Sequence, residues 1–216
     1  MNFAAVKQLN VNGKSAVRLK IGDKVLWKGL PSGYTQLDYI ECTGPQYIDT
    51  GFIPNQDTRA VVELMYFGGN GVYGARNTTS SNGFCLRTIS KQWQAQYNDK
   101  LSTVTKVDYD TEWHVADQNK NILYLDGITA CTFTYAEFSA PHALVLGGIM
   151  ANRSDVKTLY EGSGRYRSCQ LYDNGVLVRD LVPCRNPAGE IGMYDTVNAV
   201  FYGNAGTGEL VAGDPV

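Results

Sequence analysis

The residues most suited to chemistry are the acids of residues 108–112, which read DYDTE. Alternate residues of a strand point to one face, so these carboxylates would share a side. Two carboxylates about 5 Å apart are what retaining glycoside hydrolysis requires, and clustered oxygen atoms also suit Ca²⁺. The stretch leads directly into the segment that begins at Trp113, which favours a solvated turn. We expect no catalysis and no obligatory cofactor, and we keep as secondary candidates for a calcium site Asp108, Asp110 and Glu112.

The two histidines are poor candidates for a catalytic base. His114 lies in a strand-like segment, and no serine or cysteine stands beside it in a nucleophile motif. His142 follows Pro141 in a polar connection, where we expect it to be solvated. A nucleophilic enzyme is therefore not predicted.

Glycan contact is the chemistry that the polar connections support best. Aromatic rings pack on the C–H faces of sugars, and Asn, Asp and Arg side chains bond to the hydroxyl groups. Three segments offer both kinds of group: residues 73–82, 93–99 and 152–155. Half-buried packing in a sheet remains the alternative for each ring. The candidate glycan-binding residues are Tyr73, Arg76, Asn77, Trp93, Tyr97, Asn98, Asn152 and Arg153.

Composition narrows the class of protein. The chain has 216 residues, a net charge of −2 and 44% hydrophobic residues, which suits a folded chain with no bulk attraction to nucleic acid. No apolar run is long enough to cross a bilayer, and the first residues lack the pattern of a signal peptide. Five scattered cysteines without a C-x-x-C motif indicate reduced, buried thiols made in the cytoplasm.

Residues 1–30 form a basic segment that differs from the rest. They carry six basic residues and one acid, net +5, whereas the remaining 186 residues carry net −7. The sequence predicts a three-stranded meander over residues 6–11, 16–21 and 24–28, too small to be stable alone. It either packs on its own acidic body or attaches to another protein or a sister subunit. The residues assigned to this attachment arm are Lys7, Lys14, Arg18, Lys20, Lys24 and Trp27.

Residues 31–216 read as one all-β body. Short apolar runs alternate with turn residues, and no segment keeps a helical period over three turns. Asn174-Gly175 and Asp126-Gly127 are typical of two-residue hairpin turns. A polar loop is predicted over residues 151–157. Many short strands of even spacing predict a β-sandwich or jelly roll.

Two stretches carry a resemblance to a known fold. Residues 113–116 (WHVA) followed by residues 123–127 (LYLDG) resemble a strand pair of laminin-G-like, concanavalin A-like jelly rolls. Residues 146–148 and 164–172 lie where that family has its later strands. The resemblance covers about residues 35–212 and implies a jelly-roll β-sandwich.

A second resemblance concerns proteins on the surface of bacteriophages. Residues 30–41 (LPSGYTQLDYIE), 46–51 (QYIDTG), 171–175 (LYDNG) and 201–208 (FYGNAGTG) are similar to jelly-roll modules of tail-fibre-like and head-fibre-like virion proteins. Residues 11–14 (VNGK) and 25–27 (VLW) resemble small N-terminal β-units of such proteins.

This resemblance implies a non-enzymatic virion protein that contacts glycans of the host surface or of mucus. It also implies an arm that binds other virion proteins or forms a homo-oligomer, with a trimer favoured. Two alternatives stay open: a structural decoration protein without a ligand, and a glycan hydrolase of the same fold.

Overall fold

The computed structural model describes residues 9–11, 14–16, 18–21, 24–78, 81–90, 92–108 and 110–216. None of these residues is helical, and they contain no helix that is long and apolar enough to span a membrane. The all-β prediction is therefore confirmed.

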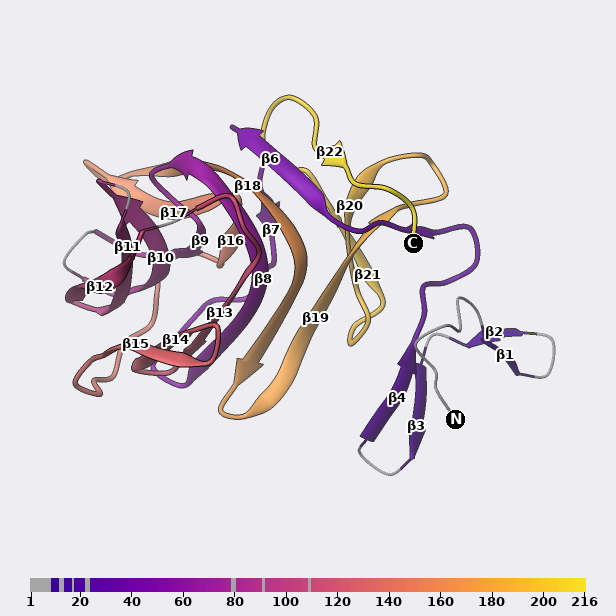
Figure 1. Cartoon of the computed structure of the whole chain (residues 1–216), viewed down its shortest axis with the longest axis horizontal. Helices are drawn as coiled ribbons and strands as arrows, with labels where there is room; N and C mark the ends of the chain where they lie inside the picture. Colours follow the sequence, from indigo (N-terminus) through magenta and orange to yellow (C-terminus); the bar gives the residue numbers. More distant parts are fainter. Residues whose placement is uncertain are drawn as a thin grey trace.

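The N-terminal arm forms two separate hairpins. Its strands are β1 (Leu9–Val11), β2 (Lys14–Ala16), β3 (Arg18–Ile21) and β4 (Lys24–Lys28). β1 pairs with β2, and β3 pairs with β4. The predicted three-stranded meander is wrong, because the expected strand over residues 16–21 is divided between two hairpins that each close on themselves. Figure 1 shows both hairpins beside the body, to which the chain continues from β4.

The body consists of two sheets. The larger one, named here the β8 sheet, contains β5 (Thr35–Gln36), β6 (Ile40–Gly44), β8 (Thr58–Gly69), β13 (His114–Asn119), β14 (Ile122–Leu125), β15 (Ile128–Thr132), β18 (Val156–Asp173), β19 (Val176–Arg185), β20 (Ile191–Asp195), β21 (Val200–Gly203) and β22 (Val211–Ala212). The other, the β10 sheet, contains β7 (Ile48–Asp49), β9 (Tyr73–Ala75), β10 (Gly83–Ile89), β11 (Gln92–Asn98), β12 (Lys100–Asp108), β16 (Val145–Leu146) and β17 (Gly148–Arg153).

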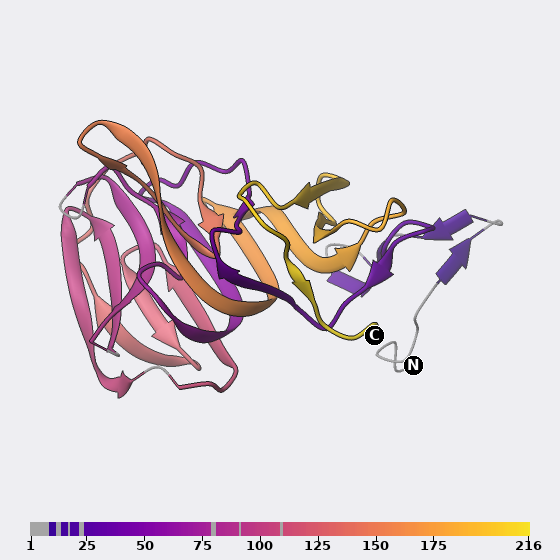
Figure 2. The ribbon, with the colours of Figure 1, turned by 90° about the horizontal axis from the view of Figure 1, so that it is seen from above.

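Strand β18 belongs to both sheets. Its first residues pair with β17 in the β10 sheet, and its later residues pair with β8, β6 and β19 in the β8 sheet. Figures 1 and 2 show β18 and β19 as a long, curved hairpin that passes from one end of the body to the other. The predicted loop over residues 151–157 is wrong. Ser154 and Asp155 both adopt positive φ angles and close a tight turn, so β17 and β18 continue almost to each other.

The core lies between the two sheets, and strand alternation explains it. Along β8 buried and half-buried residues alternate, with Ala60, Val62, Leu64 and Tyr66 directed into the core. The facing strands supply Phe84, Leu86, Trp93 and Tyr97, among others. The outward residues of β8 begin with Arg59, so this strand also presents a row of side chains on the opposite surface.

The hairpin predictions at two positions are confirmed. Asn174 and Gly175 have φ angles of 46° and 80°, and Asp126 and Gly127 have φ angles of 51° and 77°. Both pairs therefore have the left-handed geometry that a two-residue turn requires. These turns join β18 to β19 and β14 to β15, and each one fixes the pairing register of its own hairpin.

Candidate functional site

The outer face of the β8 sheet carries a hollow of about 400 Å³ in which aromatic, charged and amide side chains meet. We name it the Arg59 hollow; its lining consists of Arg59, Val115, Asp117, Asn119, Tyr124 and Gly127. Strands β8, β13 and β14 hold these side chains on the outward positions of the alternation. The register places Arg59 opposite Asn119, and Asp117 opposite Tyr124. These two cross-strand pairs are neighbours on the outer face of the sheet, so their four side chains lie close together.

A bidentate ion pair fixes the centre of the Arg59 hollow. Arg59 donates from Nε to Asp117 Oδ1 at 2.8 Å and from Nη2 to Asp117 Oδ2 at 2.7 Å. This hydrogen bonding raises the pKa of Arg59 above its usual value. The guanidinium also lies over the ring of Tyr172, with Cζ 5.3 Å from the ring centroid. The side chains of Arg59 and Asp117 are 39% and 22% exposed, so a ligand can reach them. Their two hydrogen bonds to each other already fix their orientation before a ligand binds.

The Arg59 hollow combines the groups that sugar binding needs. Tyr124 is half-buried at its wall, and a tyrosine ring can pack against the C–H face of a pyranose. The amide of Asn119 can both donate and accept a hydrogen bond, and the carboxylate of Asp117 keeps lone pairs beyond those that Arg59 uses. This arrangement suits reversible binding of a polyol rather than bond cleavage.

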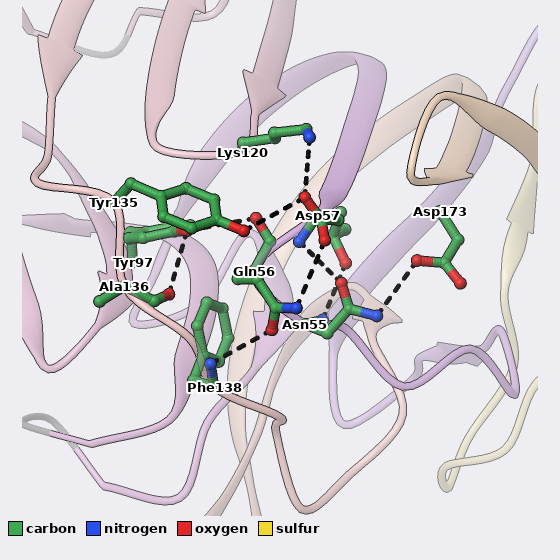
Figure 3. Close-up of polar contacts among 10 residues, drawn as sticks. Asn55, Gln56, Asp57, Tyr97, Lys120, Tyr135, Ala136, Phe138 and Asp173 are labelled. Atoms are coloured by element: carbon green, nitrogen blue, oxygen red, sulfur yellow. Dashed lines mark hydrogen bonds and ion pairs between the residues drawn. The ribbon is translucent and has the colours of Figure 1, made fainter.

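A second polar network surrounds Asp57, which directly precedes β8. We name it the Asp57 cluster; it consists of Asn55, Gln56, Asp57, Lys120, Tyr135 and Asp173. In Figure 3 the side chains of Lys120, Tyr135 and Gln56 converge on Asp57. Lys120 Nζ lies 2.7 Å from Asp57 Oδ1, and the Tyr135 hydroxyl lies 3.4 Å from the same oxygen. Asn55 donates to Asp173 at 3.1 Å, which ties the cluster to the end of β18.

The Asp57 cluster is preorganised and accessible. The Lys120 ammonium, which donates to Asp57, holds the pKa of that carboxyl below its usual value, so the acid stays ionised. Tyr135 is 49% exposed and presents an aromatic ring beside the carboxylate. Lys120 follows Asn119 directly, so this cluster extends the surface of the Arg59 hollow.

The three aromatic residues expected to touch a glycan lie in the core instead. Tyr73, Trp93 and Tyr97 are fully buried. The Trp93 ring packs against Tyr66, and the Tyr97 hydroxyl lies 3.2 Å from the carbonyl oxygen atoms of Gln56 and of Ala136. These rings occupy inward positions of β9 and β11, so they present no face to a ligand, and the expected contact is corrected to core packing.

The other expected glycan ligands partly come together. Asn152 donates from Nδ2 to Asn77 Oδ1 at 2.8 Å, and His142 Nε2 lies 2.8 Å from Asn152 Oδ1. His142 is therefore held in a hydrogen-bonded chain rather than freely solvated. Arg76 is buried near this chain, because its amide donates to Met150 on the strand that carries Asn152. Arg153 is exposed in the β17–β18 hairpin, and Asn98 lies apart at the β11–β12 turn.

The acidic stretch is used for local structure. Asp110 accepts from the Glu112 amide at 2.9 Å and lies 2.9 Å from His114 Nε2. Asp108 ends β12, and its side chain lies outside the described residues. Within the described residues no group of three or more His, Cys, Asp or Glu side chains is arranged to hold a metal ion.

His114 is clasped between two carboxylates. Its Nδ1 lies 2.7 Å from Asp126 Oδ2 and its Nε2 lies 2.9 Å from Asp110 Oδ1. Burial alone would lower the pKa of His114, but the two carboxylates outweigh it and raise the pKa above 6.5. The ion pairs of protonated His114 with the two carboxylates therefore contribute their full stabilisation at a pH below the pKa of histidine in the unfolded chain. This contribution is lost as the pH rises through the pKa of His114 in the folded protein.

We expect Asp126→Asn to lower the pKa of His114, because the variant removes one of the two negative charges. Asparagine tolerates the positive φ at this position, and its amide oxygen can still accept from the Val115 amide. The measurement is an NMR titration of the imidazole nitrogen atoms. Asp99→Asn, an exposed acid paired with Lys100, is the control. An unchanged pKa of His114 in Asp126→Asn would contradict the ion pair between His114 and Asp126.

A larger hollow lies elsewhere, over β20 and β21. Its volume is about 700 Å³, and Arg185, Glu190 and Glu209 line it together with several glycines. The one aromatic side chain in its lining, Phe201, packs near Tyr34 at 6.1 Å between ring centroids. The lining also includes the amide of Asn204. We favour the smaller Arg59 hollow because its ring and its amide lie beside a bidentate ion pair.

The proposed attachment residues lie mostly beyond what can be described. Lys7 lies outside the described residues, and so do the side chains of the other arm residues. Their assignment to an attachment surface stays a prediction. The cysteine prediction is confirmed for four residues, since Cys42, Cys85, Cys169 and Cys184 are buried free thiols and Cys131 is half-buried.

The sequence did contain a signal for the Arg59 hollow. Within the mostly apolar residues 59–67 the two charged residues, Arg59 and Glu63, are four positions apart, which places both on the same, outward face of a strand. Asp117 and Asn119 likewise share one face of the next strand, and Tyr124 follows after a short turn. Recognising the site also required the pairing of β8 with β13, which joins residues more than fifty positions apart.

Comparison with known proteins supports the fold. No protein-family model matches the chain, and no curated protein matches its sequence. The structure is similar to the crystal structure of a candidate carbohydrate-binding protein from Bacteroides ovatus, with a TM-score of 0.56 and 10% sequence identity. The match covers 94% of this chain and 68% of that protein. The body is a jelly-roll β-sandwich, as predicted.

Proposed function

We propose that this protein is a non-catalytic carbohydrate-binding protein whose ligand lies in the Arg59 hollow. The observation that carries the proposal is the placement of Tyr124 and Asn119 beside the bidentate Arg59–Asp117 pair in an open hollow. The similarity in fold to a candidate carbohydrate-binding protein agrees with it. The exposed Tyr135 of the Asp57 cluster would contact a second sugar unit of a longer chain.

We expect Tyr124→Ala to weaken binding of the recognised glycan by about tenfold, because the ring packing against the sugar is lost. The measurement is a screen of bacterial surface polysaccharides and mucin glycans, followed by isothermal titration calorimetry with each glycan that binds. Tyr202→Ala is the matched control, since Tyr202 is a half-buried tyrosine on β21, at the far side of the same sheet.

Three outcomes separate the candidate functions. Loss of affinity in Tyr124→Ala, with normal affinity in Tyr202→Ala, would support the Arg59 hollow. Absence of any binding from a folded, assembled protein would favour a structural decoration protein. Release of reducing sugar from a bound glycan would instead revive the hydrolase alternative.

The biological setting that we propose is the surface of a bacteriophage particle. It rests on the resemblance of residues 30–51 and 171–208 to virion modules. In this setting the basic arm attaches the protein to other virion proteins or joins three copies, and the body contacts glycans of the host or of mucus.

We expect removal of residues 1–29 to lower the assembled mass without changing the thermal midpoint of the body. The reason is that the arm strands pair only with each other among the described residues, whereas the body has its own core. Light scattering coupled to size exclusion measures the mass, and calorimetry measures the midpoint. A full chain that is already monomeric would contradict the assembly role.

A further inference from the structure

Arg76 is a buried cation on the side of the β10 sheet that faces away from the main core. It follows β9 and is 2% exposed, and its guanidinium carbon lies 4.7 Å from the centroid of the Tyr160 ring. Tyr160 packs on a small cluster of Cys85, Ile149 and Ala151 that is separate from the main core. Because Phe84 and Leu86 belong to the main core, Cys85 between them faces the other side of the sheet.

No acid whose side chain the structure describes neutralises Arg76. Its Nε and Nη1 are buried and have no hydrogen-bond partner, and among the described residues no carboxylate lies within 4 Å. Four half-buried arginines of the body are each paired with an acid instead. Arg59, Arg165, Arg167 and Arg179 each pair with a carboxylate, on Asp117, Glu41, Asp38 and Asp195 respectively.

A second arginine increases the positive charge at this place. Arg87 lies two residues after Cys85 on the same face of β10, and its Nε donates to Gln94 Oε1 at 2.5 Å. Burial and the neighbouring Arg76 both lower the pKa of Arg87. Burial raises the pKa of Cys85 to about 11, so the thiol stays protonated and supplies no negative charge. An unpaired buried cation is costly, and an anion from outside would remove that cost.

We propose that Arg76 and Arg87 bind the carboxylate of an acidic sugar at the surface of the β10 sheet. A guanidinium donates strong hydrogen bonds to a carboxylate, and Arg76 keeps two nitrogen atoms without a partner, Nε and Nη1. Arg87 is half-buried, so an anion from solvent would contact Arg87 first. The inference rests on the proposed carbohydrate binding but places an acid-specific site apart from the Arg59 hollow.

The test compares acidic glycans with their neutral counterparts on the full chain. The probes are tetragalacturonate with its methyl ester, and sialyllactose with lactose, each titrated by calorimetry. The wild type should bind at least one acidic probe about tenfold tighter than its neutral counterpart. Arg76→Met and Arg87→Met should each abolish that preference, because both keep an apolar side chain and lose the charge. The two probe pairs distinguish a uronate from a sialate as the source of the carboxylate.

A second readout does not depend on affinity. Tetragalacturonate or sialyllactose should raise the thermal midpoint of the wild type but not that of Arg76→Met. If Arg76→Met does not fold, Arg87→Met carries the test. Equal binding of acidic and neutral probes by the wild type, or an undiminished preference in both variants, would overturn the inference. A midpoint raised as much by sodium sulfate as by the acidic sugars would also overturn it, since the site would then hold a small anion only.

The design separates this inference from the proposed function. Tyr124→Ala should weaken neutral-glycan binding at the Arg59 hollow by about tenfold and keep the acid-dependent shift of the thermal midpoint. Arg76→Met should show the reverse. Loss of both properties in Tyr124→Ala would mean that one site serves both ligands, which contradicts the separate acidic site.

Discussion

Replacing Trp93 by alanine is expected to lower the free energy of unfolding by about 3–5 kcal/mol. Trp93 is fully buried in the core and packs against the ring of Tyr66, with 5.7 Å between ring centroids, and near His114. The truncation leaves a cavity between the two sheets that neighbouring side chains fill only in part. Equilibrium unfolding in urea, followed by intrinsic fluorescence and circular dichroism, measures the change.

Trp113→Ala is the matched control for this variant. Trp113 is half-buried on the outer surface, where the Arg167 guanidinium lies 3.7 Å from its ring centroid. Its loss removes one cation–π contact, so we expect a smaller change of about 1 kcal/mol. Equal destabilisation by the two variants would contradict the assignment of Trp93 to the core.

Gly162→Ala is expected to destabilise the protein by about 3 kcal/mol or more. Gly162 lies where β18 leaves the partners of one sheet for those of the other, and it pairs with Gly44 and Gly69. A Cβ atom at this residue would lie 1.7 Å from the carbonyl oxygen of Gly71. Backbone cannot move aside as a flexible side chain can, so the crossing of β18 would have to distort. Thermal and urea denaturation measure the loss.

Gly203→Ala provides the comparison within another strand. A Cβ atom there would meet only a ring carbon of Phe201 at 3.5 Å, which is ordinary contact. We expect this variant to stay close to the wild type. A tolerated Gly162→Ala would show that β18 does not cross between the sheets as described.

Much of the fold could be predicted from short-range patterns. The hairpin turns at Asn174-Gly175 and Asp126-Gly127 follow from the few residues that accept positive φ angles. The alternation along β8 follows from its two-sided environment. Residues 151–157 were mispredicted as a loop, because Ser154 and Asp155 are polar and resemble a loop until their backbone angles are known.

The candidate site was harder to predict, for a physical reason. Sequence gives the type of an aromatic residue but not the face of the sheet that it occupies. Trp93 and Tyr97 lie at positions that share one face of β11, and that face is the core. Tyr124 looks no different from them in sequence, but the pairing of β14 with β13 directs it outward, beside Asp117.

The shared strand β18 has a consequence for how the protein unfolds. Because one 18-residue strand supplies hydrogen-bonding edges to both sheets, neither sheet can detach from it without exposing the unpaired edge of the other. The body should therefore behave as a single cooperative unit, with calorimetric and van't Hoff enthalpies that agree. Amide hydrogen exchange along β18 should then report global opening, and a protease should find no partly unfolded body to cut.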